Sequence, residues 1–340
     1  MTRAIRALTE IPGASVQDLG RSGYLGMGVA RGGAMDRLAI HEGAALLGQS
    51  SDHAALEFSG AGGRFQVLGG AVHVAITGAQ MSVTLDGVAL PHATTGRAEQ
   101  GTVIEISGAR AGVYGYLHVD GGFATPAVLG ARATHQASGM GQQAKMGQVL
   151  PLGPGHAREP GLTLDTAPRL SGGLVRLVRS YQTDHFSAQQ RERLVHTDFI
   201  RAAQGNRMGV RLEGGRFAAE GALQVLSDII VPGDVQMTGD GAPFILLADC
   251  QTTGGYPRIG TVLPCDIPVV AQAGPGTALR MQWVSLADGV IAESKAAQHI
   301  ADLPAKVHTR LRAPQDIQDL LSYQLISGAI TGWDEEERSR

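Results

Sequence analysis

Short apolar runs separated by glycine and polar turns recur along most of the chain. Between residues 65 and 119 they read FQVL, AVHVAITG, MSVTLDG, TVIEIS and VYGYLHV, and a similar series occupies residues 172–284. Strands at such regular spacing, with Asp86-Gly87 suited to a hairpin turn, are typical of an all-β protein. The pattern therefore predicts a mainly β fold built from two series of strands.

Helical periodicity marks three segments. Residues 36–47 place apolar side chains roughly on one helical face, with Asp36 positioned to cap the helix and Gly48 to end it. Residues 187–195 predict a short helix that begins with a capping box. After Val284 the chain becomes helical and more charged through LPAKVHTRLR, DIQDLLSYQLI and WDEEERSR. This predicts a C-terminal helical arm whose last residues fray.

The best candidate for a linker is residues 151–168, which contain four prolines. At 340 residues the chain is long enough for two cores. We therefore expect an N-terminal β domain, a C-terminal β domain and the helical arm, with the boundaries 1–165, 166–290 and 291–340.

The most unusual stretch begins with an apolar run from Phe244 to Ala248, which stops abruptly at Asp249 and is followed by QTTGGYP. The run has the length of a buried strand. The glycines after it can adopt φ > 0, so consecutive amides could form an anion-binding concavity at the strand's end. The alternative is an ordinary loop punctuated by glycine and proline. Within eight residues lie an acid, an amide, two threonines and a tyrosine. This concentration of polar groups favours a binding or catalytic site.

Composition and charge exclude several classes of protein. The chain has 48 glycines, 43% hydrophobic residues and a formal charge of −3, so it should fold and carries no electrostatic footprint for nucleic acid or an anionic membrane. Cys250 and Cys265 are its only cysteines, spaced unlike a metal or redox pair, which favours a reduced cytoplasmic protein. The first residues lack a signal-peptide core and no run reaches eighteen apolar residues, so we expect neither export nor a membrane span.

Glycine is densest between residues 17 and 36, which predicts a long shaped loop rather than a regular element. Within it, Gly23-Tyr24 begins the pattern G-Y-x-x-[MI]-G, and Gly255-Tyr256 begins the same pattern in the second half. The repeat suggests that both halves place a Gly-Tyr loop around one cleft.

Four blocks give the chain a resemblance to a known family: SVQDLGRSGYLGMGVARGGAMD, HVDGGF, NRMGVRL and DCQTTGGYPRIGTVL. They resemble the signature blocks of the allophanate hydrolase subunit 2 family, also called the biotin-dependent carboxyltransferase-like family. The likeness runs from about residue 11 to residue 326, and Gly32 stands where the family usually has serine. The resemblance implies two cyclophilin-like β-barrel domains that are related by pseudo-symmetry and face each other.

The resemblance also implies an activity. Members include the carboxyltransferase region of urea carboxylase and the C component of the bacterial ATP-dependent 5-oxoprolinase, related to the regulator KipA. The chain contains no biotin carboxylase, biotinyl or amidase segment, and Lys145 lacks the preceding methionine of a biotinylation site, so we expect no covalent biotin. The favoured function is a subunit of a multi-subunit 5-oxoprolinase, an amidohydrolase that opens the lactam of 5-oxo-L-proline to L-glutamate with ATP hydrolysis.

The partners implied by this resemblance are homologues of the A and B components of 5-oxoprolinase, of which one is KipI-like. The sequence lacks the P-loop GxxxxGK[ST], so ATP would be held by an unusual loop or by a partner. Two alternatives stay open. One is a non-catalytic regulatory subunit paired with a kinase-inhibitor-like protein, and the other is a urea carboxylase-like carboxyltransferase component that uses biotin carried on another protein.

Candidate site residues come from the matching blocks and their chemistry, and no metal is expected. The catalytic candidates are Asp36, Glu57, Asp249 and Tyr256, and the substrate-binding candidates are Tyr24, Arg21, Asp120, Arg207, Gln251, Thr252, Thr253, Gly254 and Gly255. Hydroxyls and amides of residues 252–255 would stabilise the anionic oxygens that develop as a lactam opens. Arg207 would pair a substrate carboxylate, although it and Arg211 also fit solvated strand residues. Asp36 also fits a helix N-cap.

Overall fold

The computed structural model describes residues 2–156, 159–218 and 226–311, and it confirms the mainly β class. The strands of the first half are β1 (Ala4–Ala7), β2 (Ser15–Gln17), β3 (Ala55–Ser59), β4 (Arg64–Leu68), β5 (Val72–Leu85), β6 (Val88–Leu90), β7 (Thr95–Ala98), β8 (Val103–Val119), β9 (Val149–Pro151) and β10 (Leu162–Thr163). The later strands are β11 (Gly173–Val178), β12 (Phe199–Asn206), β13 (Gly209–Glu213), β14 (Asp228–Ile229), β15 (Asp234–Met237), β16 (Pro243–Leu246), β17 (Thr253–Gly254), β18 (Arg258–Val262), β19 (Ala278–Trp283) and β20 (His308–Thr309). The α-helices are α1 (Arg37–Leu47), α2 (Ala188–Val195), α3 (Ile267–Gln272) and α4 (Leu286–Lys306), and one 3₁₀ turn, η1 (Leu25–Met27), lies in the glycine-rich loop.

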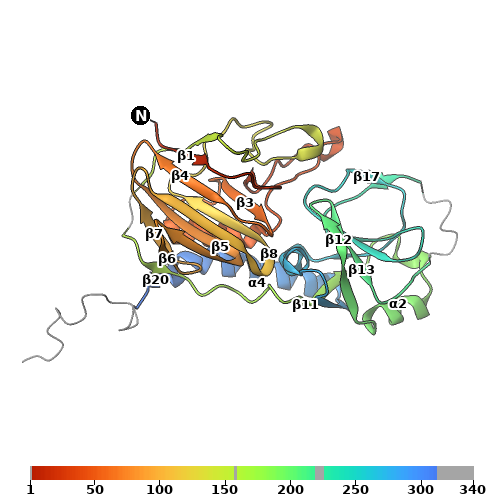
Figure 1. Ribbon diagram of the computed structural model, residues 1–340. Coiled ribbons are helices and arrows are strands. Elements are labelled where there is room, and N and C mark those ends of the chain that lie inside the picture. Colours follow the sequence, from red (N-terminus) through yellow and green to blue (C-terminus); the bar gives the residue numbers. More distant parts are fainter. Residues whose placement is uncertain (1, 157–158, 219–225, 312–340) are drawn as a thin grey trace, which may run out of the picture. The chain divides into compact units, whose positions relative to one another are not determined.

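The first half is a nine-stranded sheet with the order β2-β3-β8-β4-β1-β9, in which β5 pairs with β8, β6 and β7. The long strands β5 and β8 pair antiparallel from Val74↔Val119 to Leu85↔Ile104, with three register shifts between these ends. Such bulges bend the strands and increase their twist. The sheet therefore curls around its own core instead of lying flat (Figure 1).

The second half closes into a seven-stranded barrel with the order β11-β18-β15-β16-β13-β12-β19. A parallel pair of β11 and β19, from Gly173↔Leu279 to Leu177↔Trp283, belongs to this ring. Closure leaves the ring without unpaired edges. Of the two expected β units, the second is thus a closed barrel and the first a curled sheet (Figure 1).

The capping residues predicted for the first two helices are confirmed. Asp36 Oδ1 accepts a hydrogen bond from the Ala39 amide at 3.2 Å, and Gly48 ends α1 with a φ of +62°. Ser187 Oγ accepts a hydrogen bond from the Gln190 amide at 3.3 Å at the start of α2. A side-chain acceptor at the N-cap satisfies an amide that the first helical turn leaves unpaired.

The helix predicted after Val284 is confirmed from Leu286 to Lys306, where α4 lies. The helical prediction is wrong for the end of LPAKVHTRLR, because His308 and Thr309 form the strand β20. Leu303 of α4 is buried in one hydrophobic cluster with Leu46 and Leu47 of α1. The expected segments DIQDLLSYQLI and WDEEERSR lie outside the described residues. None of the described helices is long and apolar enough to cross a membrane.

One hydrophobic core is common to the two halves. Met35, Ile40 and Tyr116 of the first half belong to the same buried cluster as Leu177 and Val270 of the second. Residues up to 308 accordingly form one compact unit. The boundaries at residues 165 and 290 stay a prediction, but the shared core means that the region between the halves is packed interior.

Candidate functional site

Arg207 lies in the turn between β12 and β13 and points into the junction of the two halves. Its Nε donates to Asp249 Oδ2 at 2.7 Å, its Nη2 donates to Gly33 O at 2.6 Å, and its Nη1 contacts Glu57 Oε1. Only 9% of the residue is exposed, so the alternative of a solvated strand residue is wrong for Arg207. Arg211 on β13 does pair with Asp240 at the surface. Arg207 therefore joins Glu57 of one half to Asp249 of the other.

Glu57 on β3 is enclosed completely by this arrangement. Its Oε2 accepts hydrogen bonds from the Met35 amide at 2.9 Å and from the Tyr116 hydroxyl at 2.7 Å. Burial raises the pKa of Glu57, while the charge of Arg207 acts in the opposite direction. The Tyr116 hydroxyl in turn accepts a hydrogen bond from the Asp36 amide at 2.8 Å, so the two predicted acids Glu57 and Asp36 are linked through one tyrosine.

Asp36 belongs to a second buried ion network at the same junction. Its Oδ2 accepts hydrogen bonds from Arg169 Nε at 2.6 Å and from Gln272 Nε2 at 2.8 Å. Arg169 also holds Glu42 with two hydrogen bonds of 2.8 and 2.5 Å. Burial raises the pKa of Glu42 to about 7, although Arg169 opposes this shift. Asp36 is thus both the N-cap of α1 and part of the contact between the halves.

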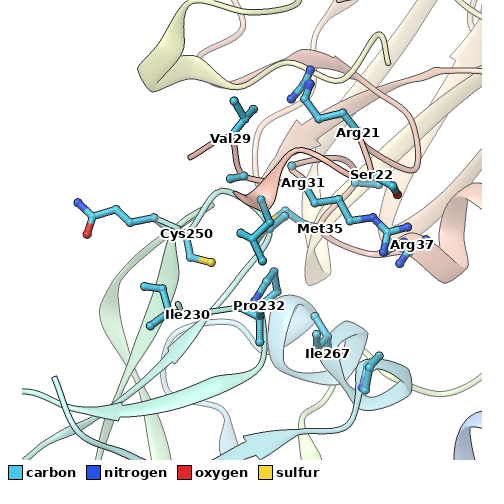
Figure 2. Close-up of a pocket in the computed structure, with 18 of the residues that line it drawn as sticks. Arg21, Ser22, Val29, Arg31, Met35, Arg37, Ile230, Pro232, Cys250 and Ile267 are labelled. Atoms are coloured by element: carbon cyan, nitrogen blue, oxygen red, sulfur yellow. The ribbon is translucent and has the colours of Figure 1, made fainter. Parts of the chain in front are cut away.

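A cavity of about 360 Å³ opens beside these networks and is lined by both halves of the chain. Its polar groups come mainly from the first half, where Arg21, Arg31 and Arg37 line it, whereas the barrel half contributes apolar side chains such as Ile230 and Ile267 (Figure 2). The described residues that line it include no acid. We call it the arginine cavity.

Two of these arginines have donor nitrogens that no described group uses. Arg21 donates from Nη2 to Ala133 O, but its buried Nε and Nη1 have no partner among the described residues, and neither has Nε of Arg37. Burial lowers the pKa of Arg21, and burial together with the charge of Arg31 lowers the pKa of Arg37 to about 10. Asp18 and Asp249 oppose the effect of burial on Arg21 without cancelling it, and an anion that reached the unpaired donors would be stabilised.

Gly32 leaves open the space next to Arg21. A Cβ at this position, where φ is +60°, would lie 3.3 Å from Arg21 Nη1 and 3.5 Å from Asp249 Oδ1. Any side chain at position 32 would therefore fill the corner in which a ligand atom could reach both groups.

A second cavity, of about 340 Å³, lies on the other side of a shared wall. Ile230, Cys250 and Gln251 line both cavities. The second one is further lined by Asn206, Met208, Gln236, Thr238, Phe244, Leu246, Gly254, Gly255 and Tyr256. None of these described lining residues is charged, so we call it the neutral cavity.

Comparison with known proteins places this architecture in a family. The family model described as the carboxyltransferase domain, subdomain A and B, matches residues 27–283. The chain belongs to this carboxyltransferase-domain family. The resemblance inferred from the sequence blocks is thereby confirmed.

Individual relatives of this carboxyltransferase domain differ in how much they share with it. The C component of the 5-oxoprolinase of Haemophilus influenzae is 31% identical over 277 residues, which cover 80% of this chain and 89% of that protein. The crystal structure of the protein TTHA0988 gives a TM-score of 0.75 with 26% identity, covering 83% of this chain and 55% of that one. The urea amidolyase of Kluyveromyces lactis gives a TM-score of 0.81 with 22% identity, covering 92% of this chain and 21% of that one. The latter likeness shows the fold, and the chain spans about a fifth of that enzyme's length.

The stretch Gln251 to Tyr256 of the carboxyltransferase domain differs from the predicted anion-binding loop. Thr253 and Gly254 form the short strand β17, which pairs with β14 through Ile229↔Thr253 and Asp228↔Gly254. Neither Gly254 nor Gly255 has a positive φ, so the expectation of left-handed glycines is wrong. Extended pairing with β14 keeps Gly254 in the β region.

The predicted binding residues of this stretch fall into two groups. Gln251, Gly254, Gly255 and Tyr256 line the neutral cavity, whereas Thr252 and Thr253 line neither cavity of the described structure. A role for the two threonines stays a prediction.

The remaining predicted residues are spread more widely. Arg21 lines the arginine cavity, as does Gly23, whereas the neighbouring Tyr24 does not. Asp120 contacts Arg3 and accepts a hydrogen bond from the His73 amide at 2.8 Å, on the first sheet and outside both cavities. The two Gly-Tyr loops therefore reach adjacent cavities rather than one cleft.

Several residues of the site were not predicted from the sequence: Arg31, Arg37, Glu42, Arg169, Gln236 and Gln272. For Gln236 a signal existed, because a glutamine between Val235 and Met237 interrupts an apolar strand. For the others, the sequence patterns that mark a helix face or a linker carry no information about pairing across the two halves.

Proposed function

We propose that this chain is a subunit of a multi-subunit 5-oxoprolinase and that its arginine cavity binds the carboxylate of the lactam substrate. The observation that carries the proposal is the set of Arg21, Arg31 and Arg37 around a mainly apolar cavity, with donor nitrogens of Arg21 and Arg37 that have no partner among the described residues. Similarity to the C component of the 5-oxoprolinase of Haemophilus influenzae supports the assignment.

The substrate of such an enzyme suits this cavity. 5-Oxo-L-proline is a small five-membered lactam with one carboxylate, and a volume of about 360 Å³ holds a molecule of that size. A carboxylate beside Arg21 would receive charge-assisted hydrogen bonds in a poorly solvated setting. The ring would then rest against apolar side chains such as Met35 and Ile230.

Among the predicted acids, Asp249 is best placed to act on a ligand in this cavity. Asp249 does not line the cavity, and its Oδ1 accepts a hydrogen bond from Arg207 Nη2 at 3.0 Å, but this oxygen lies next to the space over Gly32, a residue that does line it. Glu57 and Asp36 are enclosed by their own partners. We propose Asp249 as the group that moves a proton or positions water, with Arg207 fixing its orientation. Tyr256 faces the neutral cavity and would act only on a group bound there.

ATP would be shared with, or held by, partner subunits. Phosphorylation of the lactam oxygen makes the ring carbon open to attack by water, and this step would take place where the partner meets the substrate. Homologues of the A and B components are the proposed partners, and this chain would supply the binding of the substrate carboxylate.

The first prediction concerns assembly. The purified chain should release little or no glutamate from 5-oxoproline and ATP, and activity should appear when it is coexpressed with neighbouring homologues of the A and B components. Glutamate release measured with and without each of these proteins tests this. Robust turnover by the single chain would contradict the multi-subunit assignment, and an inactive complete complex would contradict the proposed function itself.

The second prediction concerns substrate binding. Replacing Arg21 with methionine should raise the KM for 5-oxoproline in the complete complex by about 10- to 100-fold, because a charge-assisted hydrogen bond is lost. The melting temperature should change little, since the side chain of Arg21 donates one hydrogen bond to the described residues. The matched control is Arg110→Met, at an exposed arginine on β8. An unchanged KM in Arg21→Met would remove the arginine cavity from the substrate site.

The second candidate function is carboxyl transfer with biotin carried on another protein. The family model itself, a carboxyltransferase domain, is the observation that favours it. Incorporation of labelled bicarbonate into an amide substrate in the presence of a biotinylated carrier, without glutamate release, would select this function over ring opening.

A further inference from the structure

One arginine of the arginine cavity is exposed where the cavity opens to solvent. Arg31 lines the cavity (Figure 2), and its Nε donates a hydrogen bond to Leu19 O at 3.3 Å. Within the ranges that the structure describes, its guanidinium forms no ion pair with an acid. A guanidinium has five N–H donors in a fixed plane, so most of those of Arg31 are available to a ligand.

The backbone that carries Arg31 is held in place by its neighbours. Arg31 O accepts a hydrogen bond from the Arg21 amide at 2.8 Å. Two residues further on, the chain packs against the same loop so closely that a Cβ on Gly33 would lie 2.7 Å from Gly20 N. A side chain that extends from a fixed backbone pays less ordering entropy when it meets a ligand.

The cavity holds more positive charge than one carboxylate neutralises. Arg21, Arg31 and Arg37 line it, and the described lining residues include no acid. Burial, and next to it the charge of Arg31, lower the pKa of Arg37, so these two cations lack a common anion. A carboxylate on Arg21 would leave this pair uncompensated. A second anionic group with several oxygens would therefore be stabilised where the cavity opens.

Exposed apolar side chains stand on both sides of this opening. In the first half, η1 carries Met27, which is 78% exposed and lies between the lining residues Leu25 and Val29. In the barrel half, Ile229 of β14 is 54% exposed and lies next to the lining residue Ile230. Val29 and Ile230 face the cavity from opposite sides (Figure 2). Exposed apolar side chains gathered around a cavity are typical of a protein interaction site.

Both sides of the opening are rigid. The Met27 amide donates a hydrogen bond to Tyr24 O at 2.9 Å, which closes the turn of η1. Arg258 Nη1 donates to Ile229 O at 2.7 Å, which holds β14 against the barrel. Preformed surfaces lose little entropy on association. We call Met27, Arg31 and Ile229 the docking rim.

We infer that the docking rim binds the partner subunit that holds ATP, and that Arg31 contacts the phosphates of this nucleotide. The inference rests on the proposed function, in which ATP is held by a partner. The phosphates of ATP supply the missing anion, and a planar guanidinium matches phosphate oxygens in charge and geometry. The apolar side chains around Arg31 exclude water when the partner docks, which strengthens the contact between the opposite charges.

Association tests the apolar part of the rim. The full chain is titrated by calorimetry with the homologues of the A and B components, singly and together, in the presence of the non-hydrolysable ATP analogue AMP-PNP. Met27→Glu and Ile229→Glu should each weaken association by about tenfold or more, because each places a charge in a contact that excludes water. The matched control is Val88→Glu on β6, at a valine that is 72% exposed, and it should associate as the original chain does.

Nucleotide binding tests Arg31. In the assembled complex, Arg31→Met should weaken the binding of AMP-PNP by about 10- to 100-fold, because charge-assisted hydrogen bonds to phosphate are lost. Binding of adenosine, which has no phosphate, should not change. Arg31→Lys keeps the charge without the planar group, so it should recover part of the affinity. Arg110→Met, at the exposed arginine on β8, is again the matched control.

Turnover separates the nucleotide from the lactam. In the complete complex, Arg31→Met should raise the KM for ATP by about 10- to 100-fold and leave the KM for 5-oxoproline within about threefold of the original value. This pattern is the reverse of that expected for Arg21→Met, which acts on the KM for 5-oxoproline.

Several results would overturn the inference. Unaltered association of both Met27→Glu and Ile229→Glu would place the partner elsewhere, and unaltered AMP-PNP binding by Arg31→Met would remove Arg31 from the nucleotide. Self-association of the chain that Met27→Glu abolishes would assign the rim to a second copy instead. In each of these cases the original complex still releases glutamate, so the proposed function stands. A complex that neither assembles nor releases glutamate would contradict the proposed function and the inference together.

Discussion

Replacing Arg207 with methionine should lower the free energy of unfolding by about 3–5 kcal/mol, since it leaves the buried carboxyl groups of Glu57 and Asp249 without their common cation. Methionine retains much of the volume of the arginine stem, so the loss reports on charge rather than on a void. Chemical denaturation of the full chain at neutral pH measures the effect. The expected loss is large compared with that of most point substitutions.

The matched control for Arg207 is Arg211→Met on the neighbouring strand. Arg211 pairs with Asp240 at the surface, where an ion pair contributes about 1 kcal/mol or less. Adding Glu57→Gln and Asp249→Asn to Arg207→Met should restore part of the lost stability, because neutral groups tolerate burial better than unpaired charges. Equal losses in Arg207→Met and Arg211→Met would show that the buried network does not hold the halves together.

The second large effect concerns pH. Burial raises the pKa of Glu42 from 4.5 to about 7, so between these two values the folded chain retains a proton that the unfolded chain has lost. Stability from this group is therefore fully present below pH 4.5 and is lost as the pH rises through about 7. The shift corresponds to about 3 kcal/mol.

Burial is the main cause of the raised pKa of Glu42, and a shortage of cations leaves this effect only partly opposed. Arg169 faces both Asp36 and Glu42, so a single positive charge serves two buried carboxyl groups. Burial lowers the pKa of Arg169, but the two carboxylates outweigh this effect and raise it, which keeps the guanidinium charged throughout.

Unfolding free energies of the original chain and of Glu42→Gln between pH 5 and pH 8 test this expectation. Across this pH range the difference in free energy of unfolding between the two proteins should change by up to about 3 kcal/mol. The original chain should become less stable relative to Glu42→Gln as the pH rises. A constant difference would mean that Glu42 is ionised over the whole range.

The fold was predictable wherever the decisive interaction is local. Asp36 and Ser187 cap their helices because the acceptor and the amide it satisfies lie three residues apart. The regular spacing of strands indicated the β class for the same reason, since alternation and turns are properties of neighbouring residues. Closure of the second half into a barrel involves β11 and β19, which are about 100 residues apart, and sequence spacing carries no such information.

The sequence predicted which residues belong to the candidate site better than it predicted how these residues contact one another. Glu57, Asp249 and Arg207 were all selected, but the sequence did not reveal that they contact one another. Gly254 was selected for a left-handed backbone, whereas in the structure its missing side chain makes room for Gln236. Both differences arise because a contact between distant segments decides what each residue does.

The ion networks at the junction also affect the order in which the parts of the protein can fold. Synthesis produces the acids Asp36, Glu42 and Glu57 long before the arginines at 169 and 207 that neutralise them. Domains generally fold as they emerge from the ribosome, N-terminal part first. In this chain the interior of the earlier half holds unneutralised carboxyl groups until residues 169 and 207 have been translated, so its final packing depends on sequence that emerges later.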